Sequence, residues 1–240
     1  QAAPHVGTDR LRTVVAHLRQ ELLSLGAEIR FETQLVGLEH SGGQLNAVRL
    51  RDAHGETRVP TGHVCLAIGH SARDTFAMLQ QSGIPLQQKA FAMGVRIEHR
   101  QADISRAQYG AFASQLPPAS YKLACHLPDG RGVFSFCVCP GGTVVASASE
   151  LGHLVTNGMS EFARDQENIN GALLVSVTPA DFGSADPLAG VALQRQLERA
   201  AFLSGGGDYC APCQRVEDFL LGRASTGCGA VRPSYRPGVR

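Results

Sequence analysis

The stretch Val64-Cys65-Leu66-Ala67-Ile68-Gly69-His70-Ser71-Ala72-Arg73-Asp74-Thr75-Phe76 decides the fold predicted for this chain. Its apolar residues run without interruption up to Gly69, which predicts a fully buried strand over residues 64–68. Ser71 is the expected N-cap of a helix that runs to about Gln81, with Asp74 completing a capping box. Strand ends and helix N-termini together present free N–H groups, so this junction favours a phosphate or an anionic ring as ligand.

The residues before this stretch have the pattern of a helix followed by a β-meander. Apolar residues at helical spacing predict a helix that begins at Thr8 or Asp9 and stops at Gly26. Glycine-containing turns then separate three extended segments, which cover residues 28–38, 45–50 and 56–59. We therefore predict an α/β domain over residues 1–88.

The residues from about 89 onward have the pattern of a mainly β domain with added helices. Strands are predicted at residues 91–98, 121–126, 133–139, 143–147 and 173–177. Helices are predicted near residues 104–109, 191–203 and 215–221. Pro140-Gly141-Gly142 is expected to join two of the strands as a hairpin. The predicted fold class is thus α/β plus mainly β, with domains at 1–88 and 89–240.

Composition narrows the classes of function. The 22 Lys and Arg residues nearly balance the 21 Asp and Glu residues, and this net charge of +1 predicts no nucleic-acid partner. No apolar run is long enough for a membrane span and no signal peptide is recognisable, so we expect a cytoplasmic protein with no membrane partner. Seven cysteines in a chain of 240 residues are expected to be reduced thiols.

Six short sequence segments resemble one family of proteins. They are Pro4–Leu11, Ala67–Asp74, Gly94–His99, Phe134–Gly142, Thr156–Ser160 and Pro233–Gly238. Together they resemble bacterial FAD-dependent dehydrogenases, also called NAD(P)/FAD-dependent oxidoreductases, of the two-dinucleotide-binding type. The resemblance spans essentially the whole chain. It implies a partial FAD-binding Rossmann-like domain followed by a β-rich substrate domain, and a parent protein in which FAD carries hydride to or from a small organic substrate.

One feature of that family is absent from this chain. The Gly-x-Gly-x-x-Gly fingerprint does not occur in the required strand-turn-helix context, and neither does the segment that in relatives follows the Pro237-Gly238 region. We therefore expect an internal fragment that lacks both ends of its cofactor domain and is inactive alone. Its partners would include the missing N- and C-terminal segments of its own chain.

The resemblance and the strand-to-helix junction together single out candidate site residues. A glycine at the strand end lets the backbone approach a cofactor, and helix starts supply N–H donors. The candidate FAD contacts are Gly7, Thr8, Asp9, Ala67, Gly69, His70, Ser71 and Arg73. The candidate catalytic residues are His5, His70, Cys137 and Cys139. Arg73 and Arg96 are further candidates for binding an anionic substrate.

The cysteines leave an alternative open. Cys210-Ala211-Pro212-Cys213 has the spacing of a redox pair or of half a zinc site, and strand alternation predicts that Cys137 and Cys139 face the same side. These four residues are the basis of a second hypothesis, a thiol-redox or zinc-stabilised binding module. Metal ligation is not the favoured interpretation, because this spacing matches no familiar zinc fold. A third alternative is a flavoprotein that uses its cofactor structurally or in RNA modification.

Overall fold

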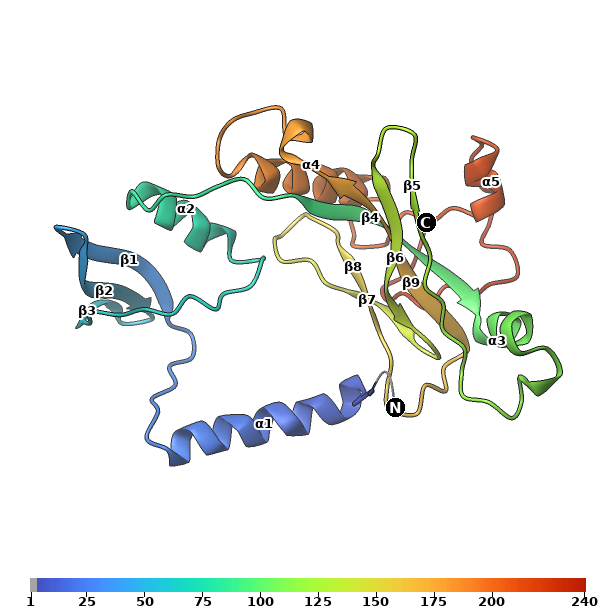
Figure 1. Ribbon diagram of the computed structural model, residues 1–240, viewed down its shortest axis with the longest axis horizontal. Helices are drawn as coiled ribbons and strands as arrows, with labels where there is room; N and C mark the ends of the chain where they lie inside the picture. The colour runs from blue at the N-terminus through green and yellow to red at the C-terminus, as the bar shows by residue number, and fades with distance from the viewer. Residues whose placement is uncertain (1–3) are drawn as a thin grey trace. The chain divides into compact units, whose positions relative to one another are not determined.

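The computed structural model describes residues 4–240, which form two compact units (Figure 1). One unit comprises residues 4–17, Ala90–Asp181 and Leu193–Arg240, and the other comprises Leu18–Lys89 and Phe182–Ala192. All pairings between the strands that the structure describes are antiparallel. The fold is therefore mixed α and β with antiparallel sheets, and the described residues do not form the expected Rossmann-like parallel sheet.

The smaller unit contains the predicted meander. Strands β1 (Gln34–Ser41), β2 (Gln44–Asp52) and β3 (Gly55–Pro60) form one sheet in the order β1-β2-β3. The turn between β1 and β2 needs residues with positive φ, which Gly42 (57°) and Gly43 (79°) supply. Helix α2 (Arg73–Gln81) ends where Ser82-Gly83-Ile84-Pro85 predicts.

The predicted buried strand at residues 64–68 is wrong. In the structure these residues form neither strand nor helix, and Val64 and Leu66 are 40% and 41% exposed. A central strand of an α/β sheet is stable only when it is paired and covered on both faces. No strand among residues 4–240 pairs with this segment, so its apolar run stays open.

The capping box predicted for Ser71 and Asp74 is also wrong. The N-cap of α2 is Ala72, whose side chain makes no cap hydrogen bond. Ser71 lies one residue too early, and its carbonyl accepts the Arg73 N–H at 2.8 Å. Asp74 instead accepts a hydrogen bond from the side chain of Gln34 on β1, which attaches the helix to the meander.

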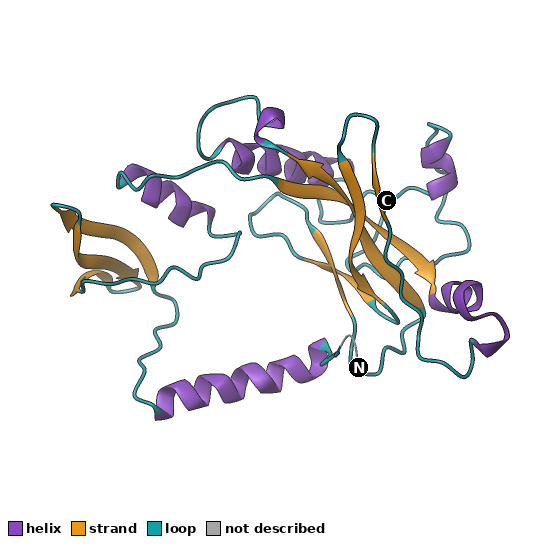
Figure 2. Ribbon diagram, in the orientation of Figure 1, coloured by secondary structure: helices purple, strands orange, loops and turns teal. Residues whose placement is uncertain are grey.

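The larger unit is built on a four-stranded sheet, drawn in orange in Figure 2. Its strands lie in the order β4 (Phe91–Arg100), β9 (Asn168–Val177), β6 (Gly132–Cys139) and β5 (Ala124–His126). β4 pairs with β9 along its whole length. The strands predicted after residue 89 are thus present, although β9 begins earlier and β5 is shorter than expected.

The predicted hairpin through Pro140-Gly141-Gly142 does not form. β6 pairs with β9 and β5, while β7 (Thr143–Ala146) pairs with β8 (Thr156–Met159) in a separate two-stranded sheet. The turn therefore carries the chain from one sheet to another. A Cβ on Gly141 would lie 1.8 Å from Arg164 O, so only glycine fits this crossing.

The other predicted helices lie close to their predicted positions. They are α1 (Thr8–Ser24), α3 (Gln101–Tyr109), α4 (Ala189–Ser204) and α5 (Val216–Leu220). Two short 3-10 helices that the sequence did not predict are also present in the described part of the chain, η1 (Gly110–Phe112) and η2 (Pro179–Asp181). α1 has the expected apolar side, yet none of its residues is buried. None of the helices over residues 4–240 is long and apolar enough to cross a membrane.

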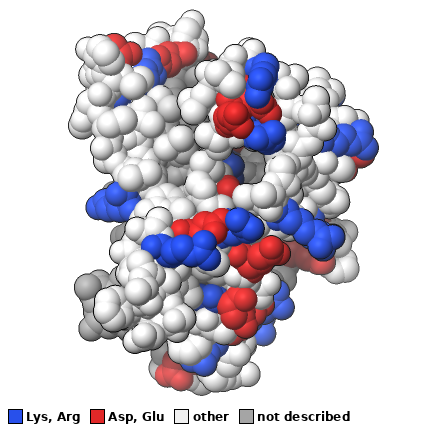
Figure 3. All heavy atoms as spheres, turned by 90° about the vertical axis from the view of Figure 1, so that its right-hand side faces the viewer, with Lys and Arg blue, Asp and Glu red and all other residues white. Residues whose placement is uncertain are grey.

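The main apolar core of the larger unit lies where β7, α4 and the C-terminal segment meet. Its buried members are Val144, Leu154, Phe202, Ala211 and Tyr235. Surface charges are mixed. On the face drawn in Figure 3, Lys and Arg side chains lie beside Asp and Glu, without a large patch of one sign.

Candidate functional site

The start of α1 is attached to the segment that follows β8. The Thr8 N–H and hydroxyl donate to Ser160 O at 3.1 and 3.3 Å. The Asp9 carboxylate accepts the Phe162 N–H at 2.9 Å, which lowers the pKa of Asp9. The N–H group of Thr8, which the sequence offered as a cofactor donor, is thus bonded to a carbonyl of the chain itself.

His5 and Gly7 belong to the same attachment. A Cβ on Gly7 would lie 2.2 Å from Phe162 N, and Gly7 has a φ of +85°, so both space and backbone conformation require glycine. The His5 Nε2 lies 2.9 Å from Glu161 O. A carbonyl can only accept, so Nε2 carries the proton and Nδ1 of the neutral ring is left as an acceptor. The structure therefore brings together four of the predicted site residues, His5, Gly7, Thr8 and Asp9.

We expect the Asp9→Ala substitution to loosen this attachment. The Phe162 amide should exchange with solvent roughly five- to tenfold faster, because it loses its carboxylate acceptor. The folded-state pKa of Asp9 is lowered, so its contribution is present above the unfolded pKa of about 4 and is lost as pH falls through the folded value. Hydrogen exchange measured at Phe162 checks both effects.

Asp165→Ala is the matched control for this substitution. Asp165 is exposed on the same segment and accepts a hydrogen bond from the Gln166 side-chain amide at 3.2 Å. The control should leave exchange at Phe162 unchanged. Equal acceleration in the two variants would show that the Asp9 bond does not hold the helix.

The second group of predicted site residues lies in the other unit. Ala67, Gly69, His70 and Ser71 are exposed, whereas Arg73 is 5% exposed at the start of α2. Gly69 has a φ of +67°, and a Cβ built there would meet no atom within 4 Å. The segment is thus open to close approach from outside the chain. His70 lies 3.4 Å from the Ser71 hydroxyl.

A polar cluster lies on one face of the large sheet, and we call it the Arg96 cluster (Arg96, Cys137, Cys139, Asn157 and Asn170). The Arg96 guanidinium donates to Asn170 Oδ1 at 2.8 Å, to Asn157 Oδ1 at 3.2 Å and to the Cys137 carbonyl at 2.7 Å. Asn170 is fully buried. The donors of Arg96 are therefore used to tie β4 to β9, β6 and β8.

The two cysteines of the cluster differ in exposure, although their thiols are neighbours. The β6 register shifts between Phe136 and Cys139, and Cys137 lies in this bulge with a φ of 45°. Cys137 is consequently exposed and Cys139 is buried. Burial raises the pKa of the Cys139 thiol and the neighbouring Cys137 thiol raises it further, which outweighs the opposing effect of Arg96. Cys139 is a thiol, and a poor nucleophile, at neutral pH.

Two residues of this cluster were missed from the sequence. Asn157 and Asn170 hold the Arg96 side chain, and the Asn170 Nδ2 has no acceptor within residues 4–240. The sequence contains a signal for Asn170, because Asn168-Ile169-Asn170 alternates polar and apolar side chains at the start of an otherwise apolar strand. No local pattern indicates that Asn157, on a different sheet, would join it.

The opposite face of the same sheet carries His99 and Tyr121. Their rings meet edge to face with centroids 5.8 Å apart. Burial lowers the pKa of His99 and raises the pKa of Tyr121, so both rings are neutral near pH 7. The Tyr121 hydroxyl is buried with no partner in the described part of the chain, which makes it a further polar group available to a ligand or water.

The described residues fit one part of an FAD site. The open backbone at Gly69 suits the approach of a flat or phosphate-bearing group. The phosphate cradle does not fit, because the sequence has no glycine fingerprint and the Thr8 N–H is already bonded. Over residues 4–240, no three His, Cys, Asp or Glu side chains converge as metal ligands, so the proposed four-cysteine zinc site is not assembled.

Comparison with known proteins bears on the larger unit. Residues 90–240 match the model of a family described as FAD-dependent protein, C-terminal domain-like. The chain belongs to this family. The match covers the sheet, the Arg96 cluster and the C-terminal core, and it supports the flavoprotein class predicted from the six sequence segments. It does not distinguish a dehydrogenase from other flavin-dependent proteins.

A relative is known from Clostridium beijerinckii. This uncharacterised protein is 45% identical over 241 residues, which cover 99% of the present chain and 44% of the Clostridium protein. The chain thus spans less than half the length of the relative that it matches.

Proposed function

We propose that this chain is part of a flavin-dependent oxidoreductase that transfers a hydride between FAD and a small organic molecule. The observation that carries the proposal is the family membership of residues 90–240. The bound FAD would supply the redox chemistry, and the protein would supply binding, orientation and proton transfer. Consistent with the length of the relative, we propose that segments outside the 240 residues provide the phosphate cradle.

The chain's own residues have distinct proposed roles. Ala67, Gly69 and Ser71 would lie along the cofactor, since their exposed segment permits close backbone approach. Arg73, which is buried at the start of α2, would contact the cofactor from the helix end. His70 is exposed, and an imidazole ring can both donate and accept a proton, so it is the proposed proton donor or acceptor toward substrate.

Of the two candidate catalytic cysteines, Cys137 is favoured over Cys139. Cys137 is exposed and held at a positive φ, as residues at functional sites often are, whereas Cys139 is buried and protonated. We therefore place Cys137, and not Cys139, at the reacting surface.

His5, the remaining catalytic candidate, is bonded to Glu161 O through Nε2, which leaves Nδ1 to accept a proton.

Flavin content tests this proposal directly. The 240-residue chain and the longer natural protein that contains it should be purified in parallel and their flavin absorbance compared. We expect the longer protein to retain FAD and the 240-residue chain to retain little or none. A longer protein that never copurifies with flavin, and that does not bind added FAD, would contradict the proposed function.

A further inference from the structure

The Cys210-x-x-Cys213 motif has no part in the proposed function, and the structure separates its two thiols by their surroundings. Cys210 lies beside the C-terminal segment, where a Cβ on Gly238 would be 3.9 Å from its sulfur. Cys213 instead lies beside Cys228: partial burial of its thiol raises the pKa of Cys213, and the neighbouring Cys228 thiol raises it further. The neighbour of Cys213 is thus a cysteine that the motif does not contain.

Hydrogen bonds along the loop between Cys213 and Cys228 explain this proximity. The Gln214 side chain donates to Arg223 O at 2.6 Å, and the Arg215 N–H donates to the Ser225 hydroxyl at 2.9 Å. These bonds connect the first residues of the loop to its last residues. The Cys213 N–H donates to Arg240 O at 2.6 Å, which fixes the beginning of the loop on the C-terminal segment.

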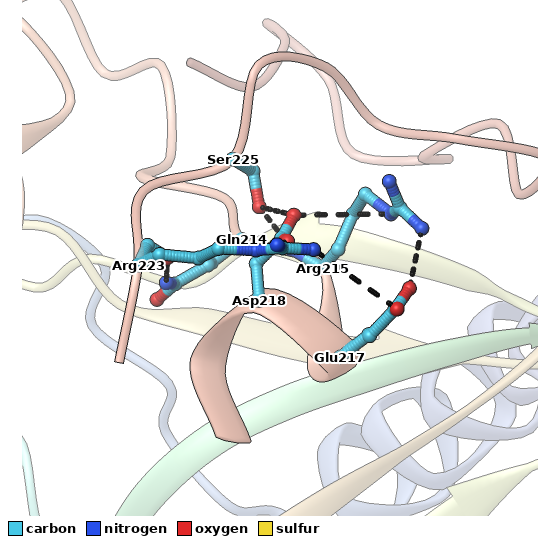
Figure 4. A network of polar contacts seen from close by, with 6 residues as sticks. All are labelled: Gln214, Arg215, Glu217, Asp218, Arg223 and Ser225. Carbon is cyan, nitrogen blue, oxygen red and sulfur yellow. Dashed lines mark hydrogen bonds and ion pairs between the residues drawn. The ribbon is translucent and has the colours of Figure 1, made fainter. Parts of the chain in front are cut away.

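A buried carboxylate holds the centre of the loop, as Figure 4 shows. Asp218, at 4% exposure, accepts from Arg223 Nε at 2.6 Å and from the Ser225 hydroxyl at 2.8 Å. These contacts lower the pKa of Asp218, so the carboxylate stays charged at neutral pH. The loop that carries α5 is therefore folded back on itself before any covalent bond forms.

We propose that Cys213 and Cys228 form a reversible dithiol–disulfide pair that closes this loop. Both cysteines are exposed and unpaired by disulfides in the structure. A thiol pair held together at the two ends of a prearranged loop needs little further ordering to bond. Cys210 is not the partner of Cys213, and the inference does not depend on the proposed flavin chemistry.

A low-molecular-weight disulfide is the oxidant in this proposal. The thiolate of one cysteine attacks it, forms a mixed disulfide and releases one small thiol. The thiolate of the second cysteine then attacks the protein sulfur of the mixed disulfide and releases the second small thiol. The two protein thiols lose two electrons and two protons in total, and the small disulfide gains them as two thiols.

Peptide mapping distinguishes the possible pairs. Trypsin cleavage after Arg199, Arg215 and Arg223 places Cys210 and Cys213 in the peptide 200–215 and Cys228 in the peptide 224–240, because the Arg232-Pro233 and Arg236-Pro237 bonds resist trypsin. The full chain is treated with oxidised glutathione, its free thiols are alkylated, and the digest is analysed by mass spectrometry. We expect peptides 200–215 and 224–240 to be joined, and to separate after reduction.

Serine variants assign the bond. The joined peptides should disappear in Cys213→Ser and Cys228→Ser and persist in Cys210→Ser and in the exposed control Cys125→Ser. Oxidation should also slow native trypsin cleavage after Arg223 several-fold in the wild-type chain. A disulfide inside peptide 200–215, a link that survives in Cys213→Ser, or glutathione retained on both thiols would overturn the proposal. Fragmentation of the joined wild-type peptides locates the bond even if a variant folds poorly.

Discussion

Replacing Gly94 with alanine is expected to lower the free energy of unfolding of the larger unit by about 3 kcal/mol, at the upper end of the cost of overpacking. A Cβ at this position would lie 1.9 Å from Leu173 O and 3.0 Å from Leu174 Cα. These are backbone atoms of β9, so they cannot turn aside as a side chain would. β4 and β9 must separate locally, although they are paired over Phe91–Arg100.

Gly227→Ala is the matched control for Gly94→Ala. It makes the same chemical change in the same unit, at a glycine with no atom within 4 Å of a built Cβ and no positive φ. Its expected effect is within about 0.5 kcal/mol. Denaturant unfolding followed by circular dichroism measures both, since the chain has no tryptophan to report by fluorescence. Equal stabilities of the two variants would show that the sheet adjusts without cost at Gly94.

The helices could be predicted from sequence because their determinants are local. The spacing of apolar residues in α1 and α4, and the glycines that follow them, indicate each helix without reference to the rest of the chain. The segment Val64–Ile68 shows the limit of such reasoning. An apolar run records that a strand can be buried, but its pairing depends on neighbouring strands that residues 4–240 do not provide.

Strand pairing is the second feature of the fold that could not be predicted from the sequence. The turn residues Pro140-Gly141-Gly142 correctly mark a change of direction, yet β6 pairs with β9, which follows about thirty residues later. The bulge at Cys137 likewise depends on the pairing of β6 with the distant strand β9. Simple alternation predicts a regular strand through Cys137 and Cys139, and only the register with β9 reveals that the strand is irregular there.

The candidate site could be predicted only in part. The sequence segment Pro4–Leu11 indicated His5, Gly7 and Asp9 as site residues, and in the structure these residues all contact the segment that follows β8. The partners of Arg96 could not be found, because Asn157 and Asn170 come from two other strands and are brought together by the packing of β8 on the sheet. Contacts between distant segments follow from topology rather than from local spacing.

Replacing Glu98 with glutamine is expected to cost roughly 2 kcal/mol of stability and to release the C-terminal segment. The Glu98 carboxylate accepts the Ser234 hydroxyl at 2.5 Å, the Ser234 N–H at 3.1 Å and the Asn168 side-chain amide at 3.0 Å. All these partners donate toward it. A glutamine would remove the charge and present an NH₂ group to one of these donors, and a hydrogen bond to a charged group contributes about 1.5–3 kcal/mol.

The Glu98 carboxylate also connects more than two segments. The Ser234 hydroxyl that donates to Glu98 accepts the Val144 N–H of β7 at 2.8 Å, so β4, β7, β9 and the C-terminal segment share this network. Amide exchange should therefore accelerate at both Ser234 and Val144 in Glu98→Gln, together with a lower unfolding midpoint. Faster amide exchange at Ser234 alone would indicate that Glu98 makes a local contact with the C-terminal segment rather than a contact shared with β7.

Glu217→Gln separates this effect from the loss of any glutamate charge. Glu217 is 61% exposed and pairs with Arg215 at 2.8 Å, and an exposed ion pair of this kind contributes about 0–1 kcal/mol. Its removal should leave exchange at Ser234 and Val144 unchanged. Tyr235, the residue next to Ser234, is buried in the apolar core. If Glu98→Gln destabilises the chain no more than Glu217→Gln, the apolar contacts of Tyr235, rather than the Glu98 carboxylate, must be what chiefly holds the C-terminal segment.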